Sequence, residues 1–373
     1  MIFRKTILYN VNSTDFFISH RLEIAKNAIQ KGYRVVVVGD KKSEIFDPLG
    51  IQSEEIKIKR STIGLLGNIE LIYQYRKIYK KHQPDLIHHI TLKPIIFGSI
   101  AAKFSRNRAK IINAVSGLGV TFANQNWVSL AIKNLLKFSL NPNHHFIFQN
   151  ESDRDIFKSL KLLRSNYIMT NGSGVNKKIF SYSPKKSKDK IIITLTARML
   201  LEKGIIVLSK AAKLLEKKYF GKVEFHLFGP IDNQNPSALS EQELLALNIK
   251  DYFIWKGNSN DIVKVLSKTD IYCLPTHYGE GIPKSIIEAM AIGRPIITTN
   301  IPGCKKCVIE GQNGYLVPIK DPVKLSKKIE KLINDKPLRE KMGKNSRTLF
   351  EKDFTLDKVV NQTFELYNNV LKL

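Results

Sequence analysis

Short apolar runs, each long enough for one buried β-strand, alternate with longer segments of helical periodicity along most of the chain. Arg34–Val38 and Ile191–Leu195 are typical of the strand-like runs, and Ser19–Lys31 and Ile205–Tyr219 of the helical segments. Strands that are apolar on both faces and separated by helices are typical of a parallel sheet with helices on both sides. The alternation therefore predicts an α/β protein built on doubly wound parallel sheets.

The alternation is interrupted once, over residues 171–188, where Gly, Ser, Pro and Lys predominate. A length of 373 residues also exceeds what one such sheet usually needs. We therefore expect two Rossmann-like domains, one over 1–170 and one over 189–350. Because ligands bind at the carboxyl ends of the strands in such folds, the two domains should face each other across a cleft. A final helix over 351–373 is expected to pack back on the N-terminal domain.

The chain is strongly basic, and the excess charge is uneven. It carries 60 Lys and Arg against 33 Asp and Glu, a formal net charge of +27. Residues 1–188 contain 31 basic and 12 acidic residues, and residues 101–150 contain six basic residues and no acidic one. A lysine-rich composition explains part of the total but not the asymmetry. The first half is therefore expected to meet a polyanion, which could be a nucleic acid, an anionic membrane or a phosphorylated substrate.

The sequence gives no sign of a membrane-spanning or exported segment. No apolar run approaches the ~18 residues that a spanning helix needs. The apolar stretch that follows Arg4 and Lys5 is too short for a signal peptide. Three cysteines are too few for a disulfide framework, which favours a reducing compartment. We therefore expect a cytoplasmic protein.

The most specific motif is a glycine loop between a strand and a helix, over residues 279–290. The backbone N–H groups of Gly281 and Ile282 would remain open to a ligand, and a helix N-terminus attracts an anion. Glu280 could face the same ligand, and Glu288 could accept two hydrogen bonds from a ribose diol. An acidic pair beside an anion site fits a ligand that carries both phosphates and hydroxyls.

A second motif contains Arg198 and Lys203, after the strand at Ile191–Leu195. The guanidinium offers a planar fork and the ammonium a point charge, so together they could neutralise a diphosphate without a metal. This segment alone would also fit an ordinary surface helix with a Glu–Lys pair. The two motifs at matching strand ends favour a site for a nucleotide diphosphate.

These residues resemble a known family. Arg198, Lys203 and the pair formed by Glu280 and Glu288 look like the nucleotide-sugar site of family 4 retaining glycosyltransferases, which have the GT-B fold. The resemblance covers nearly the whole chain. Further segments are similar to a subgroup that extends sugars on undecaprenyl diphosphate during bacterial N-glycan, O-antigen or capsule assembly. Those segments are Phe16–Leu22, Thr91–Pro94, Ser116–Gly119, Phe148–Asp153 and Asp232–Ser237.

The resemblance implies a retaining transfer of a hexose or N-acetylhexosamine from a UDP-sugar to a lipid-linked saccharide, with no metal and no cofactor. The leaving diphosphate oxygen would take the acceptor proton, and stabilising its charge would be most of the catalysis. Glu280 would contact the transferred sugar as a catalytic residue. The donor site would comprise Arg198, Lys203, Gly281, Ile282, Glu288 and, near the base, Asn258.

The first domain departs from the family pattern. Many relatives carry a glycine pair in the first loop, where this chain has small polar residues over Val11–Asp15. His89 ends a strand and is therefore a second catalytic candidate, although a lone histidine is more often structural. The candidates on the acceptor side are Ser13, Asp15, His20 and Lys93.

A broad apolar stripe over Trp127–Phe138, with Lys133 and Lys137 opposite, has two readings. It fits a helix that faces the core, or a segment that enters the headgroup region of a bilayer. The second reading suits a lipid-linked acceptor. The expected partners are then a nucleotide-sugar donor, a lipid-linked saccharide and the anionic inner leaflet of the cytoplasmic membrane. The protein would attach to that leaflet peripherally. No nucleic acid is expected as a partner.

Two other functions remain open from the residues. An enzyme of the same fold could act on the donor alone, as a UDP-sugar epimerase does, and would turn over donor without an acceptor. A basic nucleic-acid-binding protein would interleave aromatic residues with its basic clusters on one face and bind less tightly as salt rises. The sequence contains no recognised RNA- or DNA-binding module.

Overall fold

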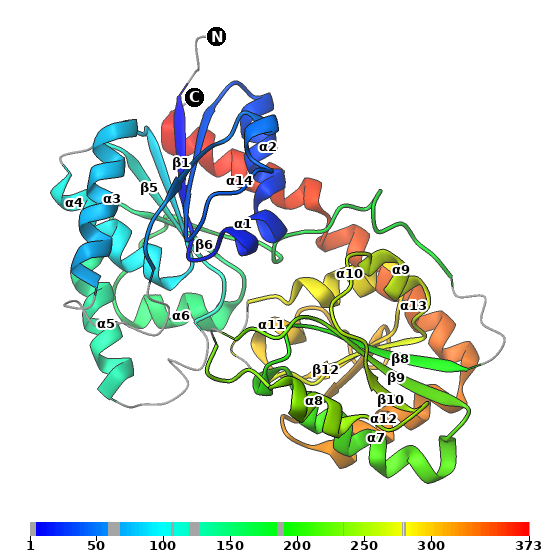
Figure 1. Ribbon diagram of the computed structural model, residues 1–373. Coiled ribbons are helices and arrows are strands. Elements are labelled where there is room, and N and C mark those ends of the chain that lie inside the picture. Colours follow the sequence, from blue (N-terminus) through cyan, green and yellow to red (C-terminus); the bar gives the residue numbers. More distant parts are fainter. Residues whose placement is uncertain are drawn as a thin grey trace. The chain divides into compact units, whose positions relative to one another are not determined.

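The computed structural model is shown in Figure 1. It describes residues 5–58, 68–105, 108–118, 127–184, 190–233, 235–277, 279 and 281–372. The chain forms two compact units. The first unit comprises Met1–Ser173 and Asp357–Leu373, and the second unit comprises Gly174–Leu356.

A parallel seven-stranded sheet forms the centre of the first unit, in the order β3-β2-β1-β4-β5-β6-β7. No residue of β1 or β4 is more than 9% exposed, because helices cover both faces. This burial explains why neither strand alternates between buried and exposed residues. The strands are β1 (Thr6–Asn10), β2 (Arg34–Gly39), β3 (Gln52–Glu55), β4 (Leu86–Ile90), β5 (Lys110–Val115), β6 (His145–Phe148) and β7 (Tyr167–Met169).

The helices of the first unit connect these strands. The sequence predicts one helix over Ser19–Lys31, but the structure ends α1 at His20 and begins α2 at Leu22. Arg21 lies between them with a non-helical backbone (φ −134°, ψ −10°). The helices are α1 (Thr14–His20), α2 (Leu22–Gln30), α3 (Ile69–His82), a π-helix (Pro94–Gly98), α4 (Ser99–Phe104), α5 (Trp127–Ser139) and α6 (Glu151–Ser159), with a 3-10 turn at Asp47–Leu49.

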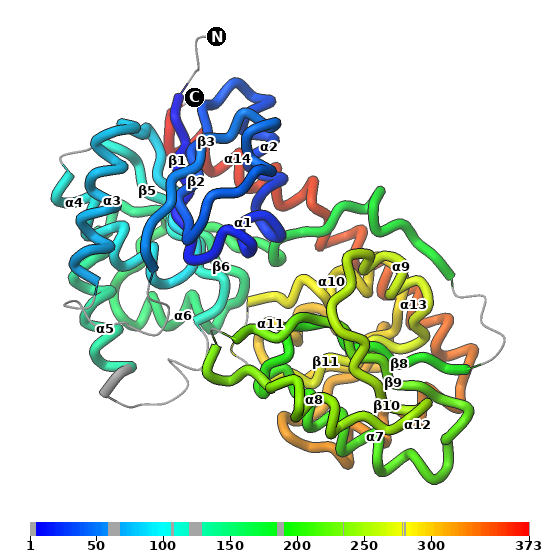
Figure 2. The backbone as a smooth tube through the Cα atoms, viewed as in Figure 1, coloured from blue at the N-terminus to red at the C-terminus, as the bar shows by residue number. Residues whose placement is uncertain are grey.

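The last helix, α14 (Leu356–Leu371), belongs to the first unit. Figure 2 shows its red tube beside the blue tubes of β1 and α2. The Tyr367 hydroxyl lies 2.6 Å from Nδ1 of His88 and 3.2 Å from the Tyr9 hydroxyl, and the Lys5 ammonium donates to the Leu371 carbonyl at 3.0 Å. These polar contacts, two of them buried, fix the end of the chain against the first sheet.

The second unit contains a parallel six-stranded sheet in the order β10-β9-β8-β11-β12-β13. The strand order reverses between β8 and β11, and in such sheets ligands bind at the carboxyl ends next to that reversal. This topology confirms the expected second Rossmann-like unit. The strands are β8 (Ile191–Thr196), β9 (Val223–Phe228), β10 (Phe253–Trp255), β11 (Ile271–Leu274), β12 (Ile296–Thr299) and β13 (Gly314–Val317).

Two groups of helices cover the second sheet. Helix α7 packs against α12, and α10 packs against α9 and α13, and Figure 1 shows the two groups on opposite sides of the sheet. The helices are α7 (Ile205–Tyr219), α8 (Glu241–Leu247), α9 (Ile262–Ser267), α10 (Lys284–Ile292), α11 (Pro302–Lys305), α12 (Pro322–Asn334) and α13 (Lys336–Asp353), with a 3-10 turn at Leu201–Lys203.

The boundary between the units differs in position from the expected linker over 171–188. The chain joins the second unit from Gly174 onward. Arg294 donates to the Ser183 carbonyl, and Arg347 donates to the Phe180 carbonyl at 2.8 Å. Composition signals a linker, but it does not reveal that two arginines far along the chain bind its backbone.

Candidate functional site

The glycine loop lies at the carboxyl end of β11, where it leads into α10. Pro283 is the N-cap residue, and α10 begins at Lys284 with its first N–H groups unpaired within the helix. Gly281 and Ile282, expected to bind the donor, are both buried immediately before this terminus. Glu280, the expected catalytic residue, lies outside the described residues.

Glu288 projects from the second turn of α10. Its side chain is 12% exposed, and one carboxylate oxygen lies 3.1 Å from the Lys284 ammonium. Burial raises the pKa of Glu288, and the neighbouring Lys284 partly offsets that rise. The carboxylate is therefore held in a poorly hydrated position, where hydrogen bonds from a ligand would be stronger than in water.

The second motif lies at the carboxyl end of β8, next to β11 in the sheet. The Arg198 guanidinium donates to the Asp232 carboxylate at 2.6 Å, with side-chain exposures of 49% and 15%. Lys203 is half-buried at the end of the 3-10 turn. Asp232 thus orients the guanidinium, while about half of the arginine side chain stays open to a ligand.

The two motif loops are joined by hydrogen bonds from one to the other. The Glu202 carbonyl accepts from the His277 backbone N–H at 2.8 Å and from the Thr276 hydroxyl at 3.0 Å. Gly204 has φ +79°, and a Cβ at this position would lie 2.1 Å from the Pro275 carbonyl oxygen. The loop that carries Arg198 and the loop that leads into α10 therefore lie in direct contact.

Two polar side chains in these loops were not singled out by the sequence. Oε2 of Glu202 and Nδ1 of His277 are buried and find no hydrogen-bond partner in the described part of the chain. Burial and the nearby Lys320 lower the pKa of His277, so its imidazole is neutral at neutral pH. Their position within or beside both motifs is the signal that could have identified them. Both atoms lie at the edge of the sheet where the two motif loops meet.

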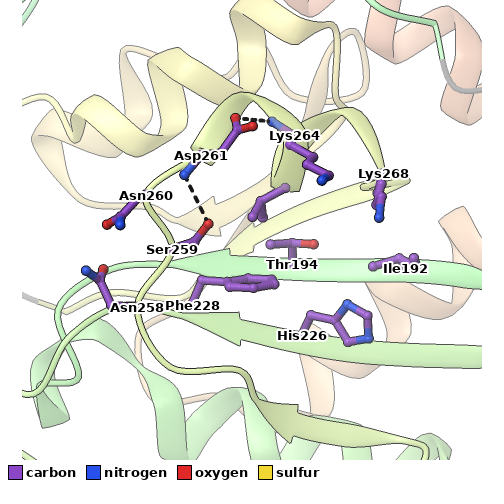
Figure 3. Close-up of a pocket in the computed structure, with 11 residues that line it drawn as sticks. Ile192, Thr194, His226, Phe228, Asn258, Ser259, Asn260, Asp261, Lys264 and Lys268 are labelled. Atoms are coloured by element: carbon purple, nitrogen blue, oxygen red, sulfur yellow. Dashed lines mark hydrogen bonds between the residues drawn. The ribbon is translucent and has the colours of Figure 1, made fainter.

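A pocket of about 490 Å³ lies along one face of β8 and β9 (Figure 3). Asn258, expected near the base, lies at one end beside Phe228, and His226 and Lys268 lie toward the other end. The Glu224 carboxylate accepts a hydrogen bond from Nε2 of His226 at 2.8 Å. The pocket exists because β9 alternates: its residues 223, 225 and 227 are buried, while 224, 226 and 228 are half-exposed.

The candidates in the first loop of the first unit have local partners. Ser13 caps α1 and accepts from the Phe16 N–H at 3.4 Å. Asp15 forms an exposed salt bridge with Lys41 at 2.9 Å. His20 ends α1, where Nδ1 lies 2.7 Å from the Ser19 hydroxyl. These residues share one loop and helix, so the structure groups them without testing their expected roles.

His89 is the penultimate residue of β4 and Lys93 follows the strand, and the two side chains differ in their surroundings. The His89 ring is fully buried, with Nδ1 2.9 Å from Asn113 Oδ1 and Nε2 3.2 Å from the Tyr79 hydroxyl. Burial lowers its pKa to about 4. A histidine with both ring nitrogens bonded inside the core fits the structural reading rather than the catalytic one. Lys93 is 7% exposed, and burial lowers its pKa to about 8.

Helix α5 has apolar side chains that face the core and others that are exposed. Ile132 and Leu136 are buried in the core, whereas Leu130 and Phe138 are 61% and 54% exposed. Phe104, at the end of the adjacent α4, is 56% exposed. The described part of the chain contains no helix that is both long and apolar enough to cross a bilayer.

Both halves of the chain match models of glycosyltransferase families. Residues 6–150 match "Glycosyl transferase 4-like" and residues 176–349 match "Glycosyl transferases group 1". The N,N'-diacetylbacillosaminyl-diphospho-undecaprenol alpha-1,3-N-acetylgalactosaminyltransferase of Campylobacter jejuni is 29% identical over 355 residues, 91% of each chain. The UDP-Gal:alpha-D-GlcNAc-diphosphoundecaprenol alpha-1,3-galactosyltransferase of Escherichia coli is 25% identical, over 82% of this chain and 80% of its own.

Solved structures show the same fold. Anabaena HepE in complex with UDP and glucose superposes with a TM-score of 0.77 at 17% identity, over 98% of this chain and 100% of that chain. The likeness confirms the two Rossmann-like units that the resemblance to GT-B enzymes implies.

Proposed function

The chain belongs to the group 1 glycosyltransferases of GT-B fold, and on that premise we propose that it transfers a hexose or N-acetylhexosamine from a UDP-sugar to a polyprenyl-diphosphate-linked saccharide. The proposed acceptor is supported by the relatives in Campylobacter jejuni and Escherichia coli, whose names specify undecaprenyl-diphosphate-linked acceptors. The second unit would bind the donor and the first unit the acceptor.

One observation carries the donor assignment: hydrogen bonds join the loop of Arg198 and Lys203 to the loop that leads into α10. The cationic side chains and the N-terminus of α10 are thereby held at adjoining strand ends, which suits a diphosphate. Glu288 would accept hydrogen bonds from the ribose hydroxyls. The uracil would lie toward Asn258, at one end of the β8–β9 pocket.

The proposed reaction retains the anomeric configuration. The bond from C1 of the sugar to the diphosphate oxygen breaks, and that oxygen takes the proton of the acceptor hydroxyl as the new glycosidic bond forms on the same face. Arg198, Lys203 and the N–H groups at the start of α10 would stabilise the charge on the leaving diphosphate. These positive groups would neutralise the diphosphate charge, as a divalent ion does in other enzymes, so the proposed mechanism needs no metal. Glu280 would contact the transferred sugar.

The test is a transfer assay with purified protein, a panel of UDP- and GDP-sugars, and undecaprenyl-diphosphate-linked mono- and disaccharides, with products identified by mass spectrometry. We expect a UDP-sugar to give a product one sugar longer than the acceptor. The transfer rate should be unchanged in excess EDTA. With an α-linked donor, NMR of the product should show that the new linkage is also α. Donor turnover without any acceptor would contradict the proposal and indicate an epimerase. An inverted linkage or loss of activity in EDTA would contradict the proposed mechanism.

We also propose that the first unit attaches peripherally to the anionic inner face of the cytoplasmic membrane. The support is the exposure of Phe104, Leu130 and Phe138 on adjacent helices, in a stretch without acidic residues. Exposed aromatic and aliphatic side chains bordered by lysines are typical of surfaces that enter the headgroup region.

Replacing Leu130 and Phe138 by serine should weaken binding to vesicles that contain anionic lipid. Burying one such side chain contributes roughly 1.5–3 kcal/mol, so the double variant should bind at least about tenfold more weakly in a flotation assay. Leu214→Ser is the matched control, because Leu214 is 58% exposed on α7 of the second unit. Equal binding by the double variant and the control would refute this surface.

A further inference from the structure

Arg21 is a buried cation at the junction between α1 and α2. Its residue exposure is 4%. Nη1 donates to the His20 carbonyl at 3.0 Å, and Nη2 donates to the Ser116 hydroxyl at 3.4 Å. Neither partner is charged, and two hydrogen bonds leave most of the five guanidinium N–H donors without a strong acceptor.

The charge of Arg21 has no counter-charge in the described part of the first unit. No carboxylate there forms a salt bridge with it, and the groups that raise its pKa are the hydroxyls of Tyr9 and Tyr367. Burial lowers the pKa of Arg21 to about 10, so the side chain stays protonated at neutral pH. Nearby His88 is neutral, because burial and Arg21 itself hold its pKa well below the usual range. A buried charge without a partner is unfavourable for folding, and a bound anion would compensate it.

The position of Arg21 places this charge at a ligand-binding edge of the sheet. Ser116 directly follows β5, and Thr91 directly follows β4, its neighbour in the sheet. The Thr91 N–H donates to the Ala114 carbonyl at 3.3 Å, which ties the two strand ends together. This edge adjoins the reversal of strand order between β1 and β4, where doubly wound sheets bind their ligands.

Thr91 adds two independent signs of a binding site. Its φ of +74° is in the left-handed region, which is strained for a β-branched residue and is found mainly at functional sites. Its hydroxyl is buried without a hydrogen-bond partner among the described residues. Lys93, two residues further on, brings a second largely buried cation to the same strand end.

We propose that Arg21, together with Lys93 and the Thr91 hydroxyl, binds the diphosphate of the lipid-linked acceptor. This inference rests on the proposed function, which assigns the donor diphosphate to Arg198 and Lys203 of the second unit and so leaves the acceptor diphosphate for the first. A guanidinium fork and an ammonium group match the oxygens of a diphosphate, and the threonine hydroxyl supplies a neutral donor.

Steady-state kinetics of Arg21→Met, Arg21→Lys and the control Arg34→Met test the assignment. Arg34 is an arginine of the same unit whose side chain bonds Gln52 and His82. We expect Arg21→Met to raise the KM for the lipid-linked acceptor at least tenfold and to leave the KM for the UDP-sugar unchanged. The acceptor KM of Arg21→Lys should lie between those of Arg21→Met and the wild type. The control should match the wild type in both KM values. An acceptor KM within twofold of the wild type in Arg21→Met would overturn the proposal.

Thermal unfolding separates this role from a structural one. With saturating UDP present to occupy the donor site, inorganic pyrophosphate should raise the melting temperature of the wild type and not that of Arg21→Met. Without pyrophosphate, Arg21→Met should melt no lower than the wild type, since it removes an uncompensated charge. A lower melting temperature with an undiminished pyrophosphate effect would show that Arg21 is structural and would overturn the proposal.

The failure of the proposed function would look different. If no lipid-linked saccharide accepts sugar, while pyrophosphate stabilises the wild type and not Arg21→Met, the anion site stands and the proposed acceptor is wrong.

Discussion

Glu288→Ala is expected to abolish sugar transfer in a protein that remains folded. The carboxylate is proposed to accept two hydrogen bonds from the ribose, and a hydrogen bond to a charged group is worth roughly 1.5–3 kcal/mol. Losing both should weaken UDP binding by about two to four orders of magnitude. The fold should tolerate the change, because burial raises the pKa of Glu288 and the ionised carboxylate is therefore held at a cost.

The matched control is Glu340→Ala. Glu340 forms the same i,i+4 pair with a lysine, Lys336, but at 3.9 Å and with an exposed side chain on α13. Titration calorimetry with UDP, the transfer assay and thermal unfolding should all give wild-type values for this control. Transfer by Glu288→Ala at the wild-type rate would show that the donor site has been misassigned.

Gly204→Ala should strongly destabilise the second unit. A Cβ at Gly204 would lie 2.1 Å from the Pro275 carbonyl oxygen, and the backbone has φ +79°. The left-handed conformation costs an alanine roughly 1–2 kcal/mol, and separating two backbone segments adds to that. We expect a total above about 3 kcal/mol, or roughly 6–12 °C in melting temperature for a unit of this size. UDP binding should weaken as well, because the two motif loops would move apart.

Gly221→Ala isolates the effect of the close approach. Gly221 has nearly the same φ, +78°, but no atom lies within 4 Å of its Cβ position. This variant should lose only about 1–2 kcal/mol from the left-handed conformation and should bind UDP normally. Equal losses in the two variants, measured by calorimetry, would mean that contact between the motif loops contributes nothing.

The sequence predicts the architecture well, because the burial of inner strands such as β2 and β11 leaves unbroken apolar runs at Val35–Val38 and Ile271–Leu274. It also predicts that Arg198, Lys203 and Glu288 lie at adjoining strand ends, since parallel strands bring their carboxyl ends to one edge. The roles of these residues, and that of Glu280, remain predictions.

Features that depend on distant contacts could not be predicted. Helical periodicity continues across Arg21, so the sequence does not show the break between α1 and α2. The buried guanidinium contacts Ser116, which is 95 residues away in the sequence. The sequence pattern places His89 at the end of a strand and so suggests a site residue, but β4 continues to Ile90 and partners on α3 and β5 enclose the ring. The β8–β9 pocket had a signal in the alternation of Val223–Phe228, which departs from the apolar pattern of the inner strands.

The most direct test is a crystal structure with UDP bound. We expect the diphosphate against Arg198, Lys203 and the N-terminus of α10, the ribose hydroxyls on the Glu288 carboxylate, and the uracil near Asn258. Uridine diphosphate bound away from these residues, or absent from crystals soaked at saturating concentration, would contradict the proposed donor site and the enzyme mechanism built on it.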